Sequence, residues 1–354
     1  DLFIIAGDLF DRQNVSSADI TKAAAILSRF VGSALLVLPG NHDFYTGIDG
    51  KPWGEFLRAM EVASAPIVLL SAARPYDLDR FDIPLTVFPA PCTNKHSAVD
   101  NISWAENVDA AAGEAGAAGA TGPGEAGAAE ATGTAGVAGA AEATGKRLRI
   151  GVVHGSLEGH SIDREGRYYP MSEAQLENLP ADFWIIGHTH RPFPEEDAEA
   201  PKFFIPGTPE PDGFDCRHTG GAWIINCTDR RVESYSRVET GTYRFYEEEL
   251  EIRAVTGIAV SRPEPKNTLL ALKLTGALSR EEYRKLPEVL DDLDRRFFYL
   301  RVNRENLDEL VNSETVETEF SSGSFPARLI GSLLAEGDQE AAQIAYRLFQ
   351  ESEA

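Results

Sequence analysis

The sequence predicts an α/β protein, and three observations carry that prediction. First, four short runs consist almost wholly of aliphatic and aromatic residues and are too short for helices, which marks them as buried strands: Leu2–Ala6, Ala34–Leu38, residues 150–153 and residues 183–186. Second, the stretches that follow the first two runs carry helix signals. Third, residues of the metal-binding kind follow each of the four runs. The carboxyl ends of neighbouring strands in an α/β sheet open onto one crevice, so residues far apart in the chain can meet there.

The other elements of the first 241 residues can be assigned in order. Two helices are expected, over residues 17–30 and 52–63, the first capped by Ser16 or Ser17 and the second opened by Pro52. A second layer of strands is expected at residues 203–205, 222–227 and 232–235. Together these elements predict a sandwich of two sheets flanked by helices, in a domain that spans residues 1–241.

One stretch inside this domain has a different composition. Residues 109–145 are almost wholly Ala, Gly, Thr and Glu, and one octamer occurs twice, at residues 126–133 and 138–145. Glycine recurs too often for a stable helix, and Val137 is almost the only large apolar side chain. We therefore expect a disordered insertion between two strands, because so little apolar surface cannot offset the entropy of ordering.

From residue 242 to residue 354 the pattern is that of a smaller α/β domain. A strand is expected at residues 268–274, then a capping box at Ser279 and Glu282 that opens a helix, and then a strand at residues 297–302. Apolar residues at helical spacing predict two short amphipathic helices between residues 325 and 354.

The residues that follow the four predicted strands are of the kinds that bind metal ions. They are Asp8, Asn41, His154, His188 and His190. Carboxylate, carboxamide and imidazole without thiolate suit Mn, with Fe or Zn as alternatives, rather than a closed structural zinc. A lone His after a strand is more often a structural residue, and a Gly-Asp pair is usually a turn. Their recurrence after four strands favours a shared metal site with hydrolytic chemistry.

The order and spacing of these motifs resemble the calcineurin-like metallophosphoesterase superfamily. Residues 6–12 (Ala-Gly-Asp-Leu-Phe-Asp-Arg) and residues 206–211 (Pro-Gly-Thr-Pro-Glu-Pro) look like the DNA double-strand-break repair exonucleases of that superfamily. The resemblance implies a metallophosphoesterase sandwich in the first domain. It also implies that the second is a capping domain, which selects DNA geometry.

The resemblance further implies a role for each motif residue. Asp8 would bridge two divalent metal ions, one completed by Asn41, His154 and His188 and the other bound by His190. His42 would be a catalytic residue beside the scissile phosphate, stabilising charge or protonating the leaving oxygen, with Asp43 orienting its ring. Asp11 and Arg12 would organise the loop.

The sequence departs from the family pattern at its start. Such proteins open with a strand that ends in an Asp-x-His motif and supplies the first metal with two ligands. This chain begins at Asp1, inside the expected second strand. We expect the sequence to be incomplete at its amino terminus.

The charge of the chain bears on its substrate. A formal net charge of -23 is unusual for a nuclease, because affinity for DNA comes largely from Lys and Arg. A local basic strip would have to grip the DNA, and the candidates are Arg164, Arg167, Arg191 and Arg217, each of which could equally be a solvated surface residue. His218 matches a position that approaches the phosphate in some exonuclease relatives, and a structural loop His is the alternative.

The function predicted is that of a DNA repair exonuclease that hydrolyses phosphodiester bonds by a two-metal mechanism. Two alternatives stay open. One is a phosphodiesterase or phosphatase that acts on a small nucleotide or a phosphoprotein, which the acidic surface would tolerate better. The other is a non-catalytic partner-binding module, if the first motif is truly absent.

Partners and compartment are less specified. In the repair family the carboxyl-terminal helices hold the coiled coil of a partner ATPase, and family members often form homo-oligomers, although no self-complementary stripe is visible here. No apolar run is long enough to span a bilayer. The three cysteines, Cys92, Cys216 and Cys227, form no metal-spaced cluster and are odd in number, so the cytoplasm is the expected compartment.

Overall fold

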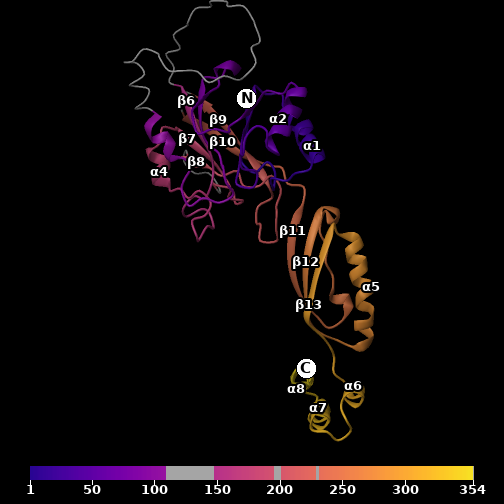
Figure 1. The fold of residues 1–354 in the computed structure, drawn as a ribbon. Coiled ribbons are helices and arrows are strands. Elements are labelled where there is room, and N and C mark those ends of the chain that lie inside the picture. Colours follow the sequence, from indigo (N-terminus) through magenta and orange to yellow (C-terminus); the bar gives the residue numbers. More distant parts are fainter. Residues whose placement is uncertain (109–146, 195–200, 229–230, 354) are drawn as a thin grey trace, which may run out of the picture. The chain divides into compact units, whose positions relative to one another are not determined.

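The computed structural model describes residues 1–108, 147–194, 201–228 and 231–353 (Figure 1). The insertion expected at residues 109–145 lies outside the described residues. The chain divides into two compact units. Unit 1 consists of Asp1–Pro209 and Gly220–Thr240, and unit 2 consists of Glu210–Thr219 and Gly241–Ala354.

Unit 1 contains a three-stranded parallel sheet in the order β1-β2-β3. Its strands are β1 (Leu2–Ala6), β2 (Ala34–Leu38) and β3 (Ile67–Leu69). The bounds of β1 and β2 are those predicted, because both strands are short apolar runs. In β2 every side chain is buried, as expected for a parallel strand covered on both faces.

A five-stranded sheet in the order β4-β5-β6-β7-β8 forms the rest of the frame of unit 1. Its strands are β4 (Tyr76–Asp77), β5 (Leu85–Ala90), β6 (Leu148–His154), β7 (Phe183–Gly187) and β8 (Phe203–Phe204). Only the β4–β5 pair is antiparallel. A separate antiparallel hairpin is made of β9 (Gly221–Thr228) and β10 (Arg231–Glu239).

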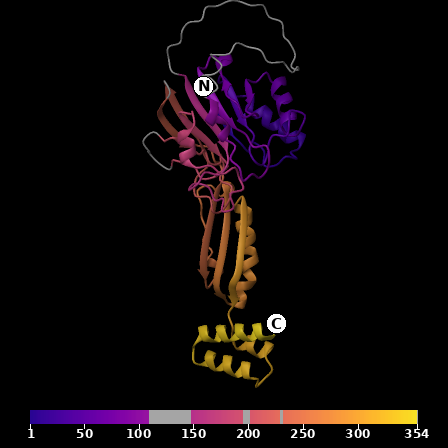
Figure 2. The ribbon, with the colours of Figure 1, turned by 60° about the vertical axis from the view of Figure 1, so that its left-hand side comes forward.

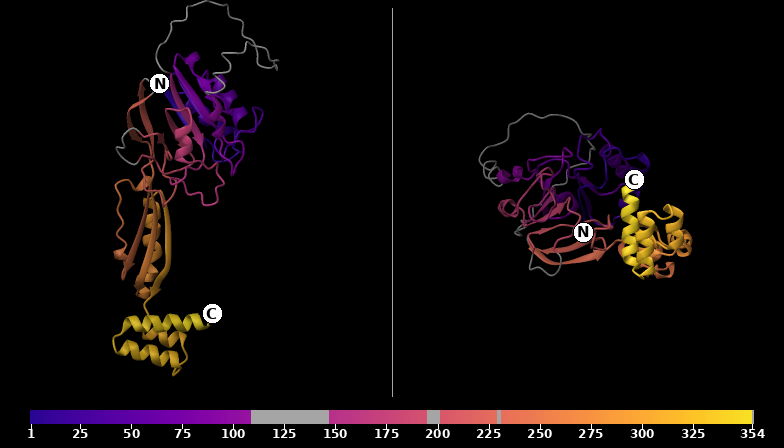
Figure 3. Two further views of the ribbon diagram at one scale, coloured as in Figure 1. Left: turned by 90° about the vertical axis from the view of Figure 1, so that its left-hand side faces the viewer. Right: turned by 90° about the horizontal axis from the view of Figure 1, so that it is seen from below.

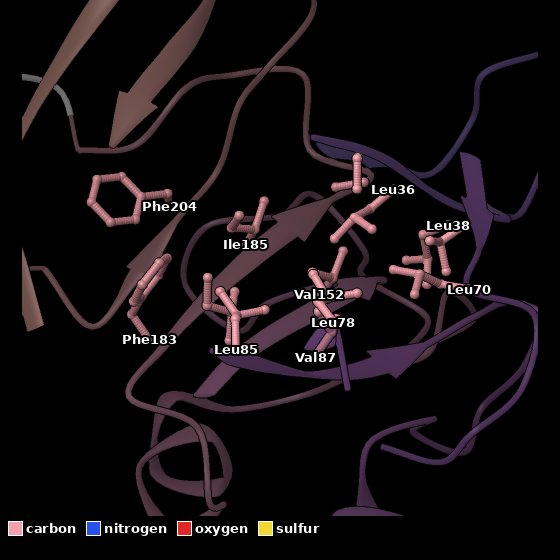
Figure 4. Close-up of a cluster of buried hydrophobic side chains, with 14 residues drawn as sticks. Leu36, Leu38, Leu70, Leu78, Leu85, Val87, Val152, Phe183, Ile185 and Phe204 are labelled. Carbon is pink, nitrogen blue, oxygen red and sulfur yellow. The ribbon is translucent and has the colours of Figure 1, made fainter. Parts of the chain in front are cut away.

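The main core of unit 1 takes buried side chains from the three-stranded sheet and from the five-stranded sheet (Figure 4). Leu36 and Leu38 come from β2, Val87 from β5, Val152 from β6 and Ile185 from β7. Burying a side chain of this size contributes about 1.5–3 kcal/mol of hydrophobic free energy. This core sets the β1–β2 and β6–β7 pairs against each other, and so brings the ends of four strands to one region.

Helices cover the other faces of the sheets in unit 1. A second cluster packs α1 (Ser17–Leu27) and α2 (Trp53–Val62) on Leu35 and Val37 of β2, with the rings of Phe10, Trp53 and Phe56 in edge contacts. Ser16, one of the two predicted caps, caps α1 by accepting from the Asp19 backbone N–H. On the five-stranded sheet lies α4 (Glu173–Asn178), opened by a capping box of Ser172 and Gln175. Short 3-10 turns occur at η1 (Asp79–Phe81) and η2 (Ser103–Asn107).

Unit 2 is built on a parallel sheet in the order β11-β12-β13, with helix α5 along one face (Figure 2). The elements are β11 (Arg244–Ile252), η3 (Val255–Gly257), η4 (Pro265–Asn267), β12 (Thr268–Leu278), α5 (Arg280–Arg296) and β13 (Tyr299–Glu309). Leu286 and Leu293 of α5 pack on Leu270, Leu272 and Leu274 of β12. The carboxyl-terminal segment forms α6 (Ser313–Glu319), α7 (Phe325–Ala335) and α8 (Gln339–Glu353), which share a small core (Figure 3).

The mixed α/β class predicted from the sequence is confirmed, whereas the sandwich and capping arrangements stay predictions, as do the two domain assignments. One local prediction was wrong in part. Ser279 caps α5 by accepting from the Glu282 N–H, but the Glu282 carboxylate accepts from the Val255 N–H at 2.8 Å, so the capping box is not closed. Among the described helices none is both long and apolar enough to cross a membrane.

Candidate metal centre

Four strand ends of unit 1 converge on the imidazole of His154. His154 is the last residue of β6 and is 1% exposed. Its Nδ1 lies 2.8 Å from the carbonyl oxygen of Ala6, the last residue of β1. Its Nε2 lies 2.9 Å from Asn41 Oδ1 and 3.2 Å from Asp8 Oδ2. The Nδ1 of His188, which follows β7, lies 3.2 Å from the same Asn41 oxygen.

Two glycines make this close approach possible. Gly7 has φ +95°, and a Cβ there would lie 2.0 Å from His154 Nδ1. A Cβ on Gly187 would lie 1.7 Å from the Ala6 carbonyl oxygen. The glycines before Asp8 and His188 are therefore required by the packing of the site, because a side chain at Gly7 would collide with His154 of β6 and one at Gly187 would collide with the end of β1.

Asp8 and His188 themselves carry unusual backbone conformations. Their φ angles are 52° and 86°, in the left-handed region that residues with a Cβ rarely adopt. Strain of this kind costs on the order of 1–3 kcal/mol per residue and concentrates at functional sites. Here it turns both side chains toward Asn41 and His154.

The protonation pattern of His154 provides a test of whether a cation fits. The Ala6 carbonyl can only accept, so Nδ1 carries the hydrogen of a neutral His154 ring and leaves a lone pair on Nε2. That lone pair faces two oxygen acceptors, Asp8 Oδ2 and Asn41 Oδ1, with no hydrogen between them. Three lone pairs that face one another repel unless a positive charge lies among them.

The pKa shifts agree that the site favours a positive charge. Burial alone would lower the pKa of His154, but its hydrogen bond to Asp8 and the charge of Asp8 raise it above its usual value. Burial alone would raise the pKa of Asp8, but His154 lowers it. A proton meets this demand in the absence of metal, and a divalent cation would meet it by ligation to the same atoms.

His188 is suited to ligation at neutral pH. Burial, followed by the charge of His154, lowers the pKa of His188 to about 4, so its ring is neutral and keeps a free lone pair. The Nδ2 of Asn41 is buried without a hydrogen-bond partner among the described residues, while its Oδ1 meets two imidazole nitrogens. An amide held in this way presents its oxygen to the site.

The donor set depends on that carboxamide. When only His, Cys, Asp and Glu are counted, no group of three within the described ranges is placed to hold a metal ion. The metal-binding roles of Asp8, Asn41, His154 and His188 therefore stay predictions. His190 lies two residues beyond His188, is exposed, and is near enough for its charge to contribute to the low pKa of His188.

His42 is exposed beside the donors and is oriented by the main chain. Its backbone N–H donates to Asp8 Oδ1 at 2.9 Å, and its ring Nδ1 lies 2.8 Å from the carbonyl oxygen of Asp11. Because that carbonyl can only accept, Nδ1 carries a hydrogen. Nε2, the other ring nitrogen, is then the one that can exchange a proton with a ligand.

The expected contact from Asp43 to His42 is not what the structure has. Asp43 is fully buried and accepts from the backbone N–H of Phe10 at 3.0 Å and of Gly40 at 2.7 Å. The Asp43 side chain is therefore turned inward, away from the exposed His42, and links the loop after β1 to the loop after β2. Burial raises the pKa of Asp43 to about 7, with a smaller contribution from the charge of Asp8.

The remaining predicted residues are not all in the same unit. Arg191 is exposed on the loop that carries His188 and His190. Arg217 and His218 belong to unit 2, whereas the donors belong to unit 1, and the substrate-binding role of these two residues stays a prediction. Asp11 and Arg12 form an ion pair at 2.7 Å, both largely exposed.

Several supporting groups were missed by the sequence reasoning. The carbonyl oxygens of Ala6 and Asp11 orient the imidazoles of His154 and His42, and a main-chain group carries no sequence signal. Gln13 donates to the Phe44 carbonyl at 2.7 Å, and Trp53 donates to the Asp43 carbonyl at 2.5 Å. The first bond joins the loops after β1 and β2, and the second joins α2 to the loop after β2. The only sequence signal for them is a side chain with an N–H donor, Gln13 or Trp53, near each motif.

The comparison with family models agrees with this geometry. The model described as Calcineurin-like phosphoesterase matches residues 1–86, which contain Asp8, Asn41, His42 and Asp43. The chain thus carries a calcineurin-like phosphoesterase domain, and its class is that of a phosphoesterase, in a family of hydrolases that typically bind two divalent metals. A search of curated proteins found no match.

Proposed function

We propose that this protein is a divalent-metal-dependent phosphodiesterase that cleaves DNA, as a repair exonuclease does. The convergence of Asp8, Asn41, His154 and His188 is the observation that supports it. Oxygen and imidazole donors of this kind suit Mn, with Fe or Zn as alternatives. When bound, two such ions would neutralise the phosphoryl oxygens and lower the pKa of a water molecule toward neutrality.

The residues of the chain have separate tasks in this proposal. Asp8 would bridge the two ions, Asn41, His154 and His188 would complete one, and His190 would bind the other. His42 would stand beside the scissile phosphate, with Nδ1 held by the Asp11 carbonyl and Nε2 directed to the leaving oxygen. Asp43 would act as a positioning residue, because it ties the backbone of Phe10 and Gly40 together.

Metal binding tests the proposal without relying on activity. Binding of Mn²⁺ to the chain, measured by electron paramagnetic resonance, should weaken by at least about 100-fold in His154→Ala and Asn41→Ala, because each removes a donor. Asn41→Asp keeps an oxygen at the site and should retain binding. His160→Ala is the matched control, since the His160 ring contacts Phe193 and Phe203 and its Nε2 pairs with Glu173 at 3.0 Å. Equal Mn²⁺ affinity in all four variants would end the proposal.

Acidity favours a second candidate, a phosphoesterase that acts on a small nucleotide or a phosphoprotein. The formal net charge of -23 opposes a long polyanion far more than a small ligand. The salt dependence of binding distinguishes a DNA substrate from a small one. Affinity for duplex DNA should fall steeply as salt rises, whereas a small substrate should show little slope. Hydrolysis of bis(p-nitrophenyl) phosphate without any binding of duplex DNA would favour the small substrate, and metal binding without hydrolysis of either would favour a non-catalytic module.

A partner surface is also proposed, on the carboxyl-terminal helices. Phe325, Ile344 and Leu348 are 63%, 54% and 60% exposed on α7 and α8. The proposed partner is the coiled coil of an ATPase subunit, whose apolar seam could cover these side chains.

A further inference from the structure

A loop beside the candidate metal centre, residues 160–168 and called here the rim loop, is attached to the His188–His190 segment at two points. The hydroxyls of Ser161 and Thr189 lie 2.5 Å apart, and Thr189 stands between His188 and His190. The Tyr168 ring lies 4.9 Å from the His188 ring, centroid to centroid. One end of the rim loop therefore contacts Thr189, between two proposed metal donors, and the other end contacts the proposed donor His188.

The rim loop is also held in one conformation. The Asp163 carboxylate accepts from the Ser156 hydroxyl at 3.0 Å, from the Arg167 N–H at 3.1 Å and from the Tyr168 N–H at 3.0 Å. A neighbouring loop pairs with it, as the Ser97 N–H donates to the Arg167 carbonyl at 2.7 Å. Side chains of the rim loop are thus presented in fixed positions.

One of those side chains, Ile162, is 95% exposed. A single exposed aliphatic residue is ordinary on a protein surface. Ile162, however, stands between two anchored neighbours, Ser161 and Asp163, next to the metal-donor segment. Val31, at 99% exposed, has no such surroundings, since it lies in the turn between α1 and β2.

Two arginines lie near Ile162 in the sequence of the rim loop. Arg164 is exposed and has no ion-pair partner among the residues that the structure describes, and Arg167 is exposed and paired with Glu165 at 2.6 Å. An aliphatic side chain beside guanidinium groups matches the end of a nucleic acid, which offers apolar base faces and phosphates together. A small phosphodiester would leave Ile162 in water.

We infer that Ile162 is a wedge that packs between the bases at the end of a DNA duplex bound at the candidate metal centre, with Arg164 on a neighbouring phosphate. The inference rests on the proposed function. It adds a specificity-determining residue: insertion of an aliphatic side chain would part the terminal base pairs and so direct the scissile strand toward the metal donors.

Fluorescence of a DNA base tests the inference without metal or turnover. A duplex with 2-aminopurine at its terminal pair is bound to the full chain in EDTA, and unstacking of that base raises its emission. Wild type, Ile162→Leu and the matched control Val31→Ser should all raise the emission. Ile162→Ser should abolish the rise and weaken duplex binding, measured by anisotropy, about tenfold, as expected for losing an apolar contact of this size.

The outcomes separate the inference from the proposed function. Wild-type protein that binds the duplex without a rise in emission would overturn the wedge and leave the proposed function standing. The wedge would also be overturned if Ile162→Ser raised the emission as much as wild type does, or if Val31→Ser lost the rise in emission as Ile162→Ser is expected to. Wild-type protein that binds no duplex either in EDTA or with Ca²⁺ in its place would remove DNA as the substrate, and the wedge with it.

Discussion

The parallel strands of unit 1 and those of unit 2 differ in what stands at their carboxyl ends. In unit 1 the strands β1, β2, β6 and β7 end at or beside Asp8, Asn41, His154 and His188. In unit 2, β12 ends at the buried Leu278, and the next residue, Ser279, caps α5. Apart from Thr268, every buried polar side chain of the described residues lies in unit 1.

The difference shows that topology brings strand ends together but does not make a site. Burying Asn41, Asp43 and His154 costs free energy that an apolar core would not, since each must find hydrogen-bond partners. Charged pairs of the unit 2 sheet such as Glu249–Lys273 and Glu247–Arg301 are exposed instead. Unit 1 thus holds the buried Asn, Asp and His side chains, whereas the sheet of unit 2 is packed with apolar ones.

The largest expected effect is on turnover, and it comes from a residue of unit 1. His42→Ala should lower kcat for phosphodiester hydrolysis by about 10²–10⁴-fold, the range for losing a general acid. Mn²⁺ affinity should not change, because the ring contacts the Asp11 carbonyl rather than the donors. Steady-state kinetics and metal titration measure the two quantities. Wild-type turnover in this variant would contradict the role given to His42.

The next effect concerns the core of unit 2. Leu286 is fully buried on α5, so Leu286→Ala should lower the free energy of unfolding of unit 2 by about 2–5 kcal/mol. All four Trp residues of the chain lie in unit 1, so urea unfolding followed by Trp fluorescence reports unit 1, and circular dichroism reports both units. Only the dichroism transition should move, with Mn²⁺ affinity unchanged. An equal shift of the Trp transition would mean that the units unfold together.

A pH dependence should distinguish the buried acid of unit 1 from the exposed acids of unit 2. The pKa of Asp43 rises from 3.8 to about 7 in the folded protein, so the folded state holds a proton that the unfolded chain releases. The contribution of Asp43 to stability is full below pH 3.8 and is lost as pH rises toward about 7.

Asp43→Asn removes this titration. In EDTA, wild-type stability relative to this variant should decrease between pH 4 and pH 8, by about 4 kcal/mol at most. Urea unfolding followed by Trp fluorescence measures it. The exposed Glu249→Gln of unit 2 should show no such difference, and a constant gap between wild type and Asp43→Asn across this range would refute the assignment.

The smallest effect is expected at the surface. Arg164→Ala should weaken duplex binding only a few-fold, and the slope of log affinity against log salt should decrease by about one, the value for one phosphate contact. Lys285→Ala, which removes an exposed cation paired with Glu281 and Glu282 on α5, is the control and should leave the slope unchanged. Anisotropy titrations at several salt concentrations measure both.

Strands with a strong apolar pattern were predictable, and others were not. The predicted bounds of β1 and β2 match the structure, because each is a five-residue apolar run, which is too short for a helix and has the length of a buried strand. β11 was missed because Glu247, Glu248, Glu249 and Glu251 give it the composition of an exposed segment. β5 was missed as well, since Pro89 argues against a strand in the interior of a sheet.

What the sequence by itself determined is the chemistry of the site: Gly-Asp, Asn-His-Asp and two His motifs, each placed where a strand ends. What only the tertiary structure decided is which atoms meet. Main-chain carbonyls of Ala6 and Asp11 set the orientation of His154 and His42, and Asp43 faces inward rather than toward His42. Side-chain identity is written in the sequence, but the direction of a backbone carbonyl depends on packing between strands distant in the chain.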